Sequence, residues 1–258
     1  MKYRCFPLII LMALGLHLHA QSDKPQSLSD LNLKGAVKTV KTFYEGDGYP
    51  YVKTEQFNRS GLLEIVSYDG ALRSGKTKYT YDKQGRLVKK DYFDFNRTLT
   101  EYIYDKKGCL VRKNIVTYEE EGDTVHEAVE YINGNDCKPR FIKDNDGTTD
   151  SLVYDKNGRL ISLWNQSYRT DYTYDDAGRL LSEDNNRGET VTYFVYDGNG
   201  SLVETWTTRD GKEIERSRFE VSGKLDAKGN WLTQKLTYSD ENGTRTETIT
   251  RTIEYYSK

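Results

Sequence analysis

The side chains best suited to bind a ligand in this sequence are aromatic. Trp164 and Trp206 each follow a glycine-containing turn, and Tyr79, Tyr102 and Tyr172 lie in alternating polar and apolar segments. Their rings combine a flat apolar surface with a polar edge, and Asp, Asn and Arg are interleaved with them. These five residues are therefore predicted to bind a glycan or a peptide. The opposing interpretation, that the tryptophans fill the inner face of the fold, is the more frequent fate of large aromatic residues.

Acid–base catalysis would need a different arrangement, in which two carboxylates face each other across a cleft, as in glycosidases. Asp91 and Asp94 flank an aromatic pair, and Asp175 adjoins Asp176. Several of the Asp residues have a backbone role in turns, which explains their spacing without catalysis. A carbohydrate-active hydrolase with a pair of Asp or Glu carboxylates is thus the alternative function, and no catalytic residue is assigned.

Metal and cofactor chemistry has little support. His126 is the single histidine after residue 20 and lies in a polar segment, as surface histidines do. Asp144 and Asp146 stand close to Gly147 and Asp150 and resemble a calcium loop, but their spacing differs from that of an EF-hand and favours a β-turn. No phosphate-binding loop or nucleophile motif occurs. We expect no metal, no cofactor and no enzymatic activity.

A recurring frame, Tyr-Asp-x-x-Gly-x-Leu, must position these side chains. Clear copies start at Tyr81, Tyr104, Tyr154, Tyr174 and Tyr196. Weaker copies start at Phe57 and Leu225, and a degenerate copy is expected at Tyr131–Cys137. Most copies begin about 20 to 25 residues apart, a period typical of repeat architectures.

Each copy predicts the corner of a β-hairpin. The Asp carboxylate accepts hydrogen bonds from backbone N–H groups of a type I turn, and the Gly takes the left-handed conformation that a Cβ would strain. The Tyr ends one strand and the Leu begins the next. The residues with this structural role are Asp82, Gly85, Gly108, Asp155, Gly158, Asp175, Gly178, Asp197 and Gly200. We expect positive φ at all five glycines.

The frame resembles the YD repeat, also called the RHS repeat. Three copies keep the full Tyr-Asp-x-x-Gly-Arg-Leu signature, whereas Cys109 and Ser201 replace the Arg in two others. The likeness covers about residues 30–258, and Leu33–Val40 is similar to the first strand of small secreted bacterial YD-repeat proteins. The resemblance implies a fold of β-hairpins and no particular reaction. The chain has too few repeats for the hollow shell around a toxin that large relatives form.

The fold class follows from the alternation before each corner. We predict an all-β protein, a long antiparallel meander of YD-repeat hairpins with roughly sixteen to eighteen strands, in one domain at residues 33–258. A single open sheet of that length would twist, curl or split. Apolar doublets such as Leu160-Ile161 place apolar groups on both faces. We therefore expect a curled single sheet or a partly closed one.

Residues 1–20 have the features of an export signal. Lys2 and Arg4 precede an apolar run at residues 6–16, which is too short to span a membrane, and no Cys follows it as a lipoprotein would require. We expect cleavage of this segment, a polar leader at residues 21–32, and no membrane span in the mature protein. The expected location is the periplasm or the extracellular space.

Charge and composition narrow the class of partner. Removal of residues 1–20 lowers the number of Lys and Arg from 38 to 36 against 40 Asp and Glu, a net charge of −4 with no large block of either sign. This argues against nucleic acid as a partner. The partner is not identified, and a glycan or an envelope protein is expected. We predict an exported, non-enzymatic binding or scaffolding protein of the cell envelope.

Cys109 and Cys137 remain as a pair after export to an oxidising compartment. Successive corners on one edge of a meander are expected about 10 Å apart, which is two strand spacings. A disulfide needs Cα atoms within about 7 Å of each other. We therefore expect two separate thiols. A bridge would require the stretch at residues 119–146 to fold inward.

Overall fold

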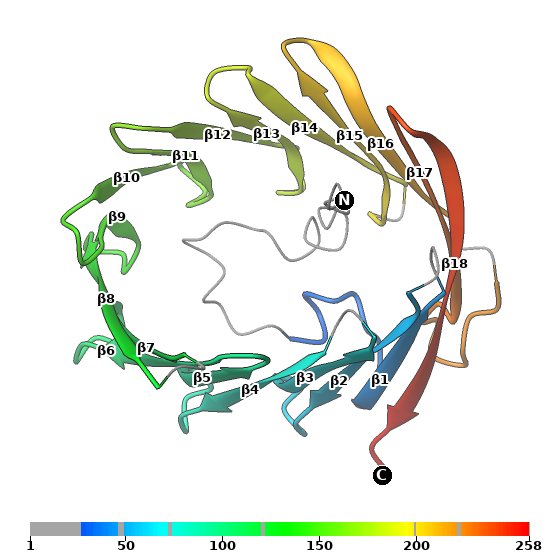
Figure 1. Cartoon of the computed structure of the whole chain (residues 1–258), viewed down its shortest axis with the longest axis horizontal. Coiled ribbons are helices and arrows are strands. Elements are labelled where there is room, and N and C mark those ends of the chain that lie inside the picture. The colour runs from blue at the N-terminus through cyan, green and yellow to red at the C-terminus, as the bar shows by residue number, and fades with distance from the viewer. Residues whose placement is uncertain are drawn as a thin grey trace.

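The computed structural model of the chain describes residues 27–45, 49–71, 74–119, 122–198, 200–220 and 223–257. These residues form eighteen β-strands in one antiparallel sheet (Figure 1). The strands are β1 (Val37–Tyr44), β2 (Tyr51–Phe57), β3 (Leu63–Gly70), β4 (Gly75–Tyr81), β5 (Leu87–Phe93), β6 (Arg97–Tyr104), β7 (Leu110–Tyr118), β8 (Thr124–Asn133), β9 (Pro139–Lys143), β10 (Thr149–Tyr154), β11 (Leu160–Trp164), β12 (Arg169–Tyr174), β13 (Leu180–Asn185), β14 (Thr190–Tyr196), β15 (Leu202–Arg209), β16 (Lys212–Glu220), β17 (Thr233–Asp240) and β18 (Gly243–Tyr255).

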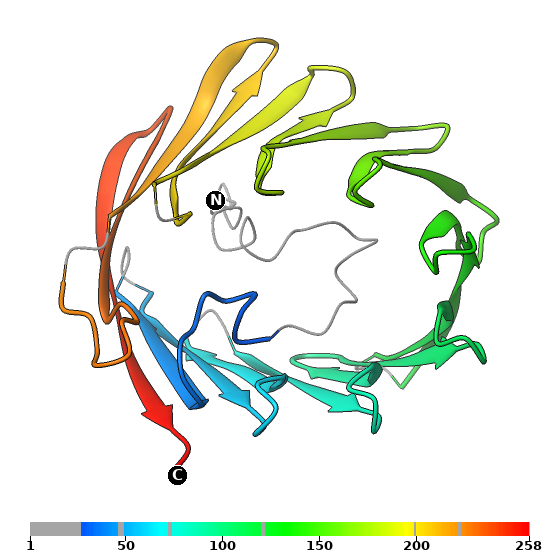
Figure 2. The ribbon, with the colours of Figure 1, turned by 180° about the vertical axis from the view of Figure 1, so that it is seen from behind.

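The sheet closes into a ring. Every strand pairs with its neighbour in sequence, and β1 also pairs with β18, which completes an up-and-down barrel (Figures 1 and 2). The predicted strand number is confirmed, although the sheet is closed rather than only curled. The long strand β18 explains the closure, because residues 243–250 pair with β17 and residues 249–255 pair with β1. Closure removes the unpaired edges of an open sheet.

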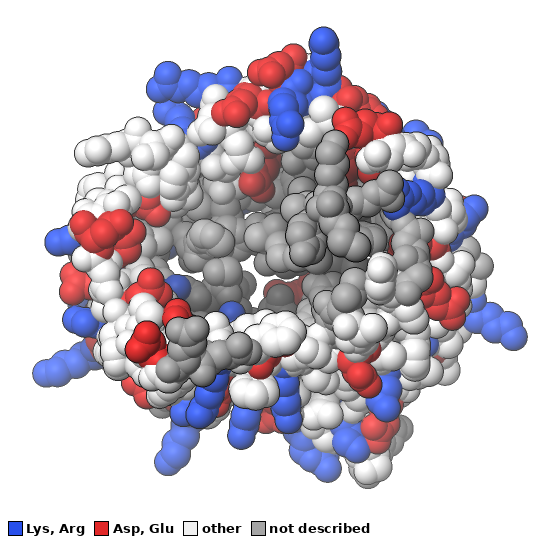
Figure 3. All heavy atoms as spheres, viewed as in Figure 1, with Lys and Arg blue, Asp and Glu red and all other residues white. Residues whose placement is uncertain are grey.

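Cross-strand pairs divide the wall into an inner and an outer face. Val40, Glu55 and Val66 lie in one row across β1, β2 and β3, and all three are buried. Residues 27–36 lie inside the ring in Figures 1 and 2, and their leucines pack in the cluster that contains Val40 and Val66. The row of Val40 therefore belongs to the inner face. Figure 3 shows charged side chains around the perimeter of the molecule. The molecule is hollowed at its centre in this view.

The inner face carries the apolar core. The Leu that ends each frame is buried in four copies, at Leu63, Leu87, Leu160 and Leu180. One cluster extends along β10–β14, a second joins β1–β3 to the segment before β1, and a third lies at β17, β18 and β1. The four frame leucines lie directly next to the corners on the inner face. Burial of each leucine side chain stabilises the fold by about 1.5–3 kcal/mol.

A β-bulge at the corner sets which side chains face inward. In the pairing of β10 with β11, Val153 is opposite Ser162 but Tyr154 is opposite Leu160, so one extra residue enters β11. Leu160 therefore packs in the inner cluster, while Ser162 and Trp164 face outward. Strict alternation of side chains would place all three on one face, and the extra residue at the bulge is the reason that they are divided between the two faces.

Cys109 and Cys137 form a disulfide, with their Cα atoms 5.0 Å apart. The expectation of two separate thiols is therefore wrong. It used the distance between corner centres, which is two strand spacings, whereas the facing flanks of successive corners are one spacing apart, about 4.8 Å. Cys109 is the sixth residue of its frame, and Cys137 takes the glycine position of the next corner with a φ of 60°.

The degenerate corner lies two residues later than predicted. Gly134 N donates to Lys138 O at 2.9 Å and Cys137 N donates to Gly134 O at 3.2 Å, which are the two turn hydrogen bonds of the clear copies. The frame therefore spans Asn133–Pro139 instead of Tyr131–Cys137. Asn133 and Gly134 replace the Tyr and Asp of the frame, so the two residue types that identify a copy in the sequence are missing here.

Candidate binding surface

Eight corners with the same two turn hydrogen bonds follow the even-numbered strands β2 to β16, so they gather at one end of the ring, the repeat rim. Asp175 shows how a corner is built. Its Oδ1 accepts from Arg179 N at 2.8 Å and its Oδ2 from Arg179 Nε at 2.6 Å. Asp155 accepts from Arg159 in the same way. The Arg N–H groups hold the pKa of both carboxyls below the usual range.

The glycine of each corner adopts the left-handed conformation. The prediction of positive φ is confirmed at Gly85 (78°), Gly108 (86°), Gly158 (79°), Gly178 (84°) and Gly200 (83°). A side chain at these positions would be strained by the backbone even where space is open. The turn glycines thus fix the direction in which each frame Arg leaves the rim.

The frame Arg and Tyr connect successive corners. Arg86 Cζ lies 4.7 Å from the centroid of the Tyr104 ring, and the Tyr104 hydroxyl donates to Leu87 O at 2.8 Å. The same Arg–Tyr contact joins Arg159 to Tyr174 at 5.0 Å and Arg179 to Tyr196 at 4.9 Å. A guanidinium over an aromatic face contributes about 0.5–1 kcal/mol at exposed sites. We call this contact the Arg–Tyr latch.

The five predicted ligand residues do not form one surface. Tyr79, Tyr102 and Tyr172 belong to the inner face, where Tyr102 and Tyr172 are buried and burial raises the pKa of Tyr79 to about 12. Trp164 and Trp206 lie half-buried on the outer face. The wall of the ring separates the two sets. Trp164 and Trp206 therefore do not fill the inner face, and the bulge at the corner before each of them is the reason.

Both ring faces of Trp206 have neighbours. On β14 its cross-strand partner is Tyr193, and the two rings stack with centroids 4.9 Å apart and an interplanar angle of 16°. On β16 its partner is Arg216, whose Cζ lies 5.2 Å from the indole centroid. Trp206 is thus one member of a row of stacked groups and leaves little of its flat surface for a sugar.

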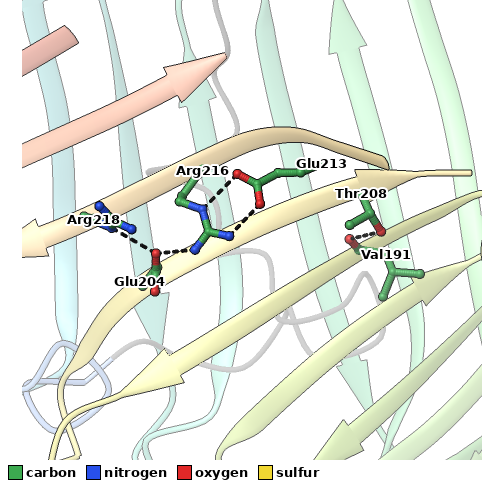
Figure 4. Close-up of polar contacts among 6 residues, drawn as sticks. All are labelled: Val191, Glu204, Thr208, Glu213, Arg216 and Arg218. Atoms are coloured by element: carbon green, nitrogen blue, oxygen red, sulfur yellow. Dashed lines mark hydrogen bonds and ion pairs between the residues drawn. The ribbon is translucent and has the colours of Figure 1, made fainter. Parts of the chain in front are cut away.

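Two carboxylates hold Arg216 in this row (Figure 4). Arg216 Nη1 donates to Glu204 Oε1 at 2.5 Å, and its Nε and Nη2 donate to the two oxygens of Glu213 at 2.8 and 2.5 Å. Arg218 Nε also donates to Glu204 Oε1, at 3.0 Å. The hydrogen bonds from Arg216 lower the pKa of Glu204 and of Glu213. The cluster is neutral in total and suits a structural role on the wall.

Trp164 has a more open neighbourhood. On β12 its partner is Arg169, whose Cζ lies 5.8 Å from the ring centroid and whose guanidinium is bound by Asp171 at 2.7 and 2.9 Å. On β10 its partner is the small Ser151, and the partner of Ser151 on β9 is Phe141, which is 43% exposed. The two aromatic residues therefore stand two strand spacings apart, about 10 Å, with a hydroxyl between them. We call this row the outer slot.

Two of the acidic residues considered for hydrolysis, Asp91 and Asp175, are engaged in other contacts. Asp91 is bound by Arg97 at 2.8 and 2.7 Å, and Asp175 forms its corner. On the inner face, burial raises the pKa of Glu183 and of Glu215. These two lie in one row with two threonines between them, so about 14 Å separates their strands. A glycosidase pair needs roughly 5–10 Å.

The candidate calcium loop is a β-turn between β9 and β10. Gly147 N donates to Asp144 O at 3.2 Å, and Thr148 N donates to Asp146 Oδ1 at 2.7 Å. Within the ranges that the structure describes, no three His, Cys, Asp or Glu residues are grouped to hold a metal ion. The same ranges contain no helix with the length and apolar character of a transmembrane span.

Residues 154–190 match the family model of the RHS repeat. This stretch contains two full copies of the frame, in which the Asp binds the Arg and the Gly is left-handed. The chain therefore contains an RHS repeat in this stretch. The match fits a structural role for the repeats, in agreement with their contribution to the wall of the ring.

A curated relative contains a similar repeat region. The chain is 26% identical over 194 residues, 70% of its length, to the tRNA3(Ser)-specific nuclease WapA of Bacillus spizizenii. The chain spans only 8% of the length of that relative. The nuclease activity in that name is thus a property of a much longer protein.

The comparison with solved structures gave matches with TM-scores below 0.5. A porin-like protein from Bacteroides uniformis ATCC 8492 is 12% identical with a TM-score of 0.47, and the match covers 86% of this chain and 99% of that one. The complex TcdB2-TccC3-Cdc42 is 17% identical with a TM-score of 0.40, covering 74% of this chain and 10% of that one.

The RHS frame alone did not reveal the outer-face neighbours. Tyr193, Arg216 and Phe141 lie outside the frame, so the frame does not point to them. A signal was present, because counting outward from the corner at Asp197 and adding one residue for the bulge places Tyr193 opposite Trp206. The same count from other corners would have assigned every outer row.

Proposed function

We propose that this chain is an exported, non-enzymatic binding or scaffolding protein of the cell envelope. Residues 1–20 would be removed as a signal peptide, and residues 33–258 would act as one domain. The disulfide between Cys109 and Cys137 supports this proposal, since such bonds persist in oxidising compartments. The charged start and apolar run at the N-terminus support it independently.

We place glycan binding at the outer slot formed by Phe141, Ser151 and Trp164. The observation that carries this assignment is a small hydroxyl residue between two outward aromatic residues. The apolar face of a sugar ring can pack against such aromatic surfaces, while its hydroxyls bond to polar neighbours such as Arg169 and Asp171. Trp206 is less suitable, because Tyr193 and Arg216 flank its ring.

A glycan is favoured over an extended peptide. Peptides that add a strand to a sheet need an unpaired edge. Among the described strands, β1 and β18 would be the edges of an open meander, and here they pair with each other. The hydrolase alternative is less favoured for a separate reason, since Glu183 and Glu215 stand about 14 Å apart and Asp91 is bound by Arg97.

The glycan assignment is tested by titrating the mature protein against a panel of envelope glycans. Trp164→Ala should weaken binding at least tenfold, and Ser151→Trp, which fills the slot, should abolish it. Trp206→Ala is the matched control and should retain binding. Equal loss with the Trp164 and Trp206 variants would refute the assignment to the slot. Release of reducing sugar from any bound glycan would favour the hydrolase.

Export is tested separately by N-terminal sequencing and fractionation. We expect the stable protein to start at Gln21 and to be recovered with soluble periplasmic or extracellular material. A stable protein that still carries Met1 would contradict export. This result would leave the glycan assignment standing, because the slot does not depend on the signal.

A further inference from the structure

A cavity of about 560 Å³ opens on the repeat rim, between the corner after β2 and the corner after β4. Leu62 and Glu64 form the wall on the side of the first corner, and Tyr81 and Asp82 form the wall on the side of the second. The Tyr81 ring is fixed in place, because its hydroxyl donates to Leu63 O at 2.5 Å. The cavity therefore has a preformed aromatic wall.

The cavity lies where the Arg–Tyr latch is missing. The sixth frame residue before Tyr104, Tyr174 and Tyr196 is an Arg that covers the ring, and Tyr154 has Lys138 at 5.7 Å and Arg140 at 5.1 Å. The sixth residue before Tyr81 is Leu62. Among the frame tyrosines that the structure describes, Tyr81 alone has no recorded cation over its ring.

The remaining latch geometry is intact around the gap. A Cβ on Gly85 would lie 3.6 Å from Leu62 Cδ1, and a Cβ on Gly200 would lie 3.5 Å from Arg179 Nη1. Leu62 thus follows the same path as a latch Arg but ends before a guanidinium would begin. Asn58 takes the place of the Asp that binds the Arg in complete copies, so both members of the ion pair are replaced.

We propose that this cavity binds the guanidinium of an arginine side chain presented by another polypeptide. The guanidinium would stack on Tyr81, as Arg159 stacks on Tyr174. Arg159 Nη1 also donates to Asp175 O at 2.9 Å, and the equivalent acceptor in the cavity is Asp82 O. Glu64 supplies a carboxylate to the lining, which also includes Lys78 and Lys83. The latch site that this chain leaves empty is thereby completed from outside.

The chemistry favours arginine over lysine and over neutral ligands. A guanidinium is planar, so it can lie flat on a ring and donate sideways to a carbonyl at the same time. An ammonium group can approach the ring but lacks the second, in-plane donor. The site is on the rim and is separate from the outer slot, so this proposal does not depend on glycan binding.

The test uses N-acetyl-arginine amide as the probe and the NMR signals of tyrosine rings as the readout. Titration of the mature protein should shift the Tyr81 ring signals in a saturable way. The uncharged citrulline analogue should bind at least tenfold more weakly. The Tyr174 ring, which Arg159 already covers, is the internal control and should not respond.

Variants that fill or empty a latch make the test decisive. Leu62→Arg should complete the latch and abolish the response of Tyr81, and Leu62→Lys is the second filling variant in case the first folds poorly. Arg179→Leu should create the same gap over Tyr196 and make that ring responsive. The proposal is overturned if Tyr81 does not respond in the unmodified protein, if its response survives both filling variants, or if the Arg179 variant gains no response.

Discussion

Asn133 stands where the clear copies have Tyr, and it makes the same hydrogen bond to the preceding repeat. Its Nδ2 donates to Leu110 O at 2.7 Å, as the Tyr104 hydroxyl donates to Leu87 O. Cys109 likewise takes the place of a latch Arg and reaches the next corner through a covalent bond. At the residue scale, each frame position is defined by its contact with the next copy, so different side chains can satisfy it.

The turn glycines allow a direct test of backbone strain. Gly178 has a φ of 84° and nothing within 4 Å of an added Cβ, so Gly178→Ala should lose roughly 1 kcal/mol or more of unfolding free energy through strain alone. Gly198→Ala is the matched control, because its surroundings are equally open and its φ is not positive. Urea unfolding of both variants measures the difference. Equal midpoints would contradict the role of φ.

Acid should weaken the corner at Asp226. Burial by itself would raise the pKa of this carboxyl, but hydrogen bonds from the Tyr255 hydroxyl and from the N–H groups of Asn230 and Lys228 hold it at about 2. The unfolded value is about 3.9, so the contribution of Asp226 is present above pH 4 and is lost as the pH falls through 2.

Asp226→Asn should therefore flatten the fall in stability between pH 5 and pH 2. Urea midpoints across that range provide the measurement, with the exposed Asp176→Asn variant as the control. The pKa values of Asp82, Asp155 and Asp175 are also lowered by their hydrogen bonds, so some acid dependence will persist in the variant. An unchanged slope in the Asp226 variant would show that its hydrogen bonds do not stabilise the fold.

At the scale of elements, the hairpin corners were predictable and their consequences across the sheet were not. Asp82 and Gly85 indicate a turn through their local backbone preferences. The number of strands and the positions of the corners therefore follow from the sequence. The outward position of Trp164 depends on a bulge, which the alternation of side chains does not reveal. The disulfide depends on the spacing between the flanks of two corners, which is a property of the assembled sheet. The outer slot could not be predicted either, because it depends on the register of three neighbouring strands, β9, β10 and β11.

The disulfide connects two hairpins and should contribute to stability mainly by restricting the unfolded chain. It closes a loop of 28 residues, for which chain entropy gives about 3 kcal/mol. Cys109→Ser combined with Cys137→Ser should lower the unfolding free energy by that order, and reduction of the native protein should give the same loss. Thiol titration of the unfolded, unreduced protein should find no free thiol. Two titratable thiols would contradict the bridge.

At the scale of the whole molecule, the ring depends on one seam. Asn230 is 2% exposed and joins the chain before β1 to the end of β18. Its Oδ1 accepts from Lys34 N at 2.8 Å, and its Nδ2 donates to Lys34 O at 2.9 Å and to the Tyr255 hydroxyl at 2.7 Å. No other described corner carries a side chain with this linking role to the segment before β1, because Asn230 takes the sixth frame position next to the seam.

Removal of this link should open the ring at a defined place. Asn230→Ala leaves Lys34 without its partners and should cost about 1–3 kcal/mol. Amide hydrogen exchange should then accelerate first in β1 and in residues 249–255 of β18, while β11–β13 on the far side stay protected. Uniform acceleration in all strands would instead indicate that the ring opens as one unit.

Closure through an antiparallel seam also restricts how the number of strands in a ring of this kind can change. Neighbouring strands run in opposite directions all the way round, which is possible only for an even number of strands. Loss of a single strand would set two parallel neighbours side by side at the seam, whereas loss of a complete hairpin would leave sixteen strands and a narrower bore. The bore of such a protein can therefore widen or narrow only in steps, one hairpin at a time.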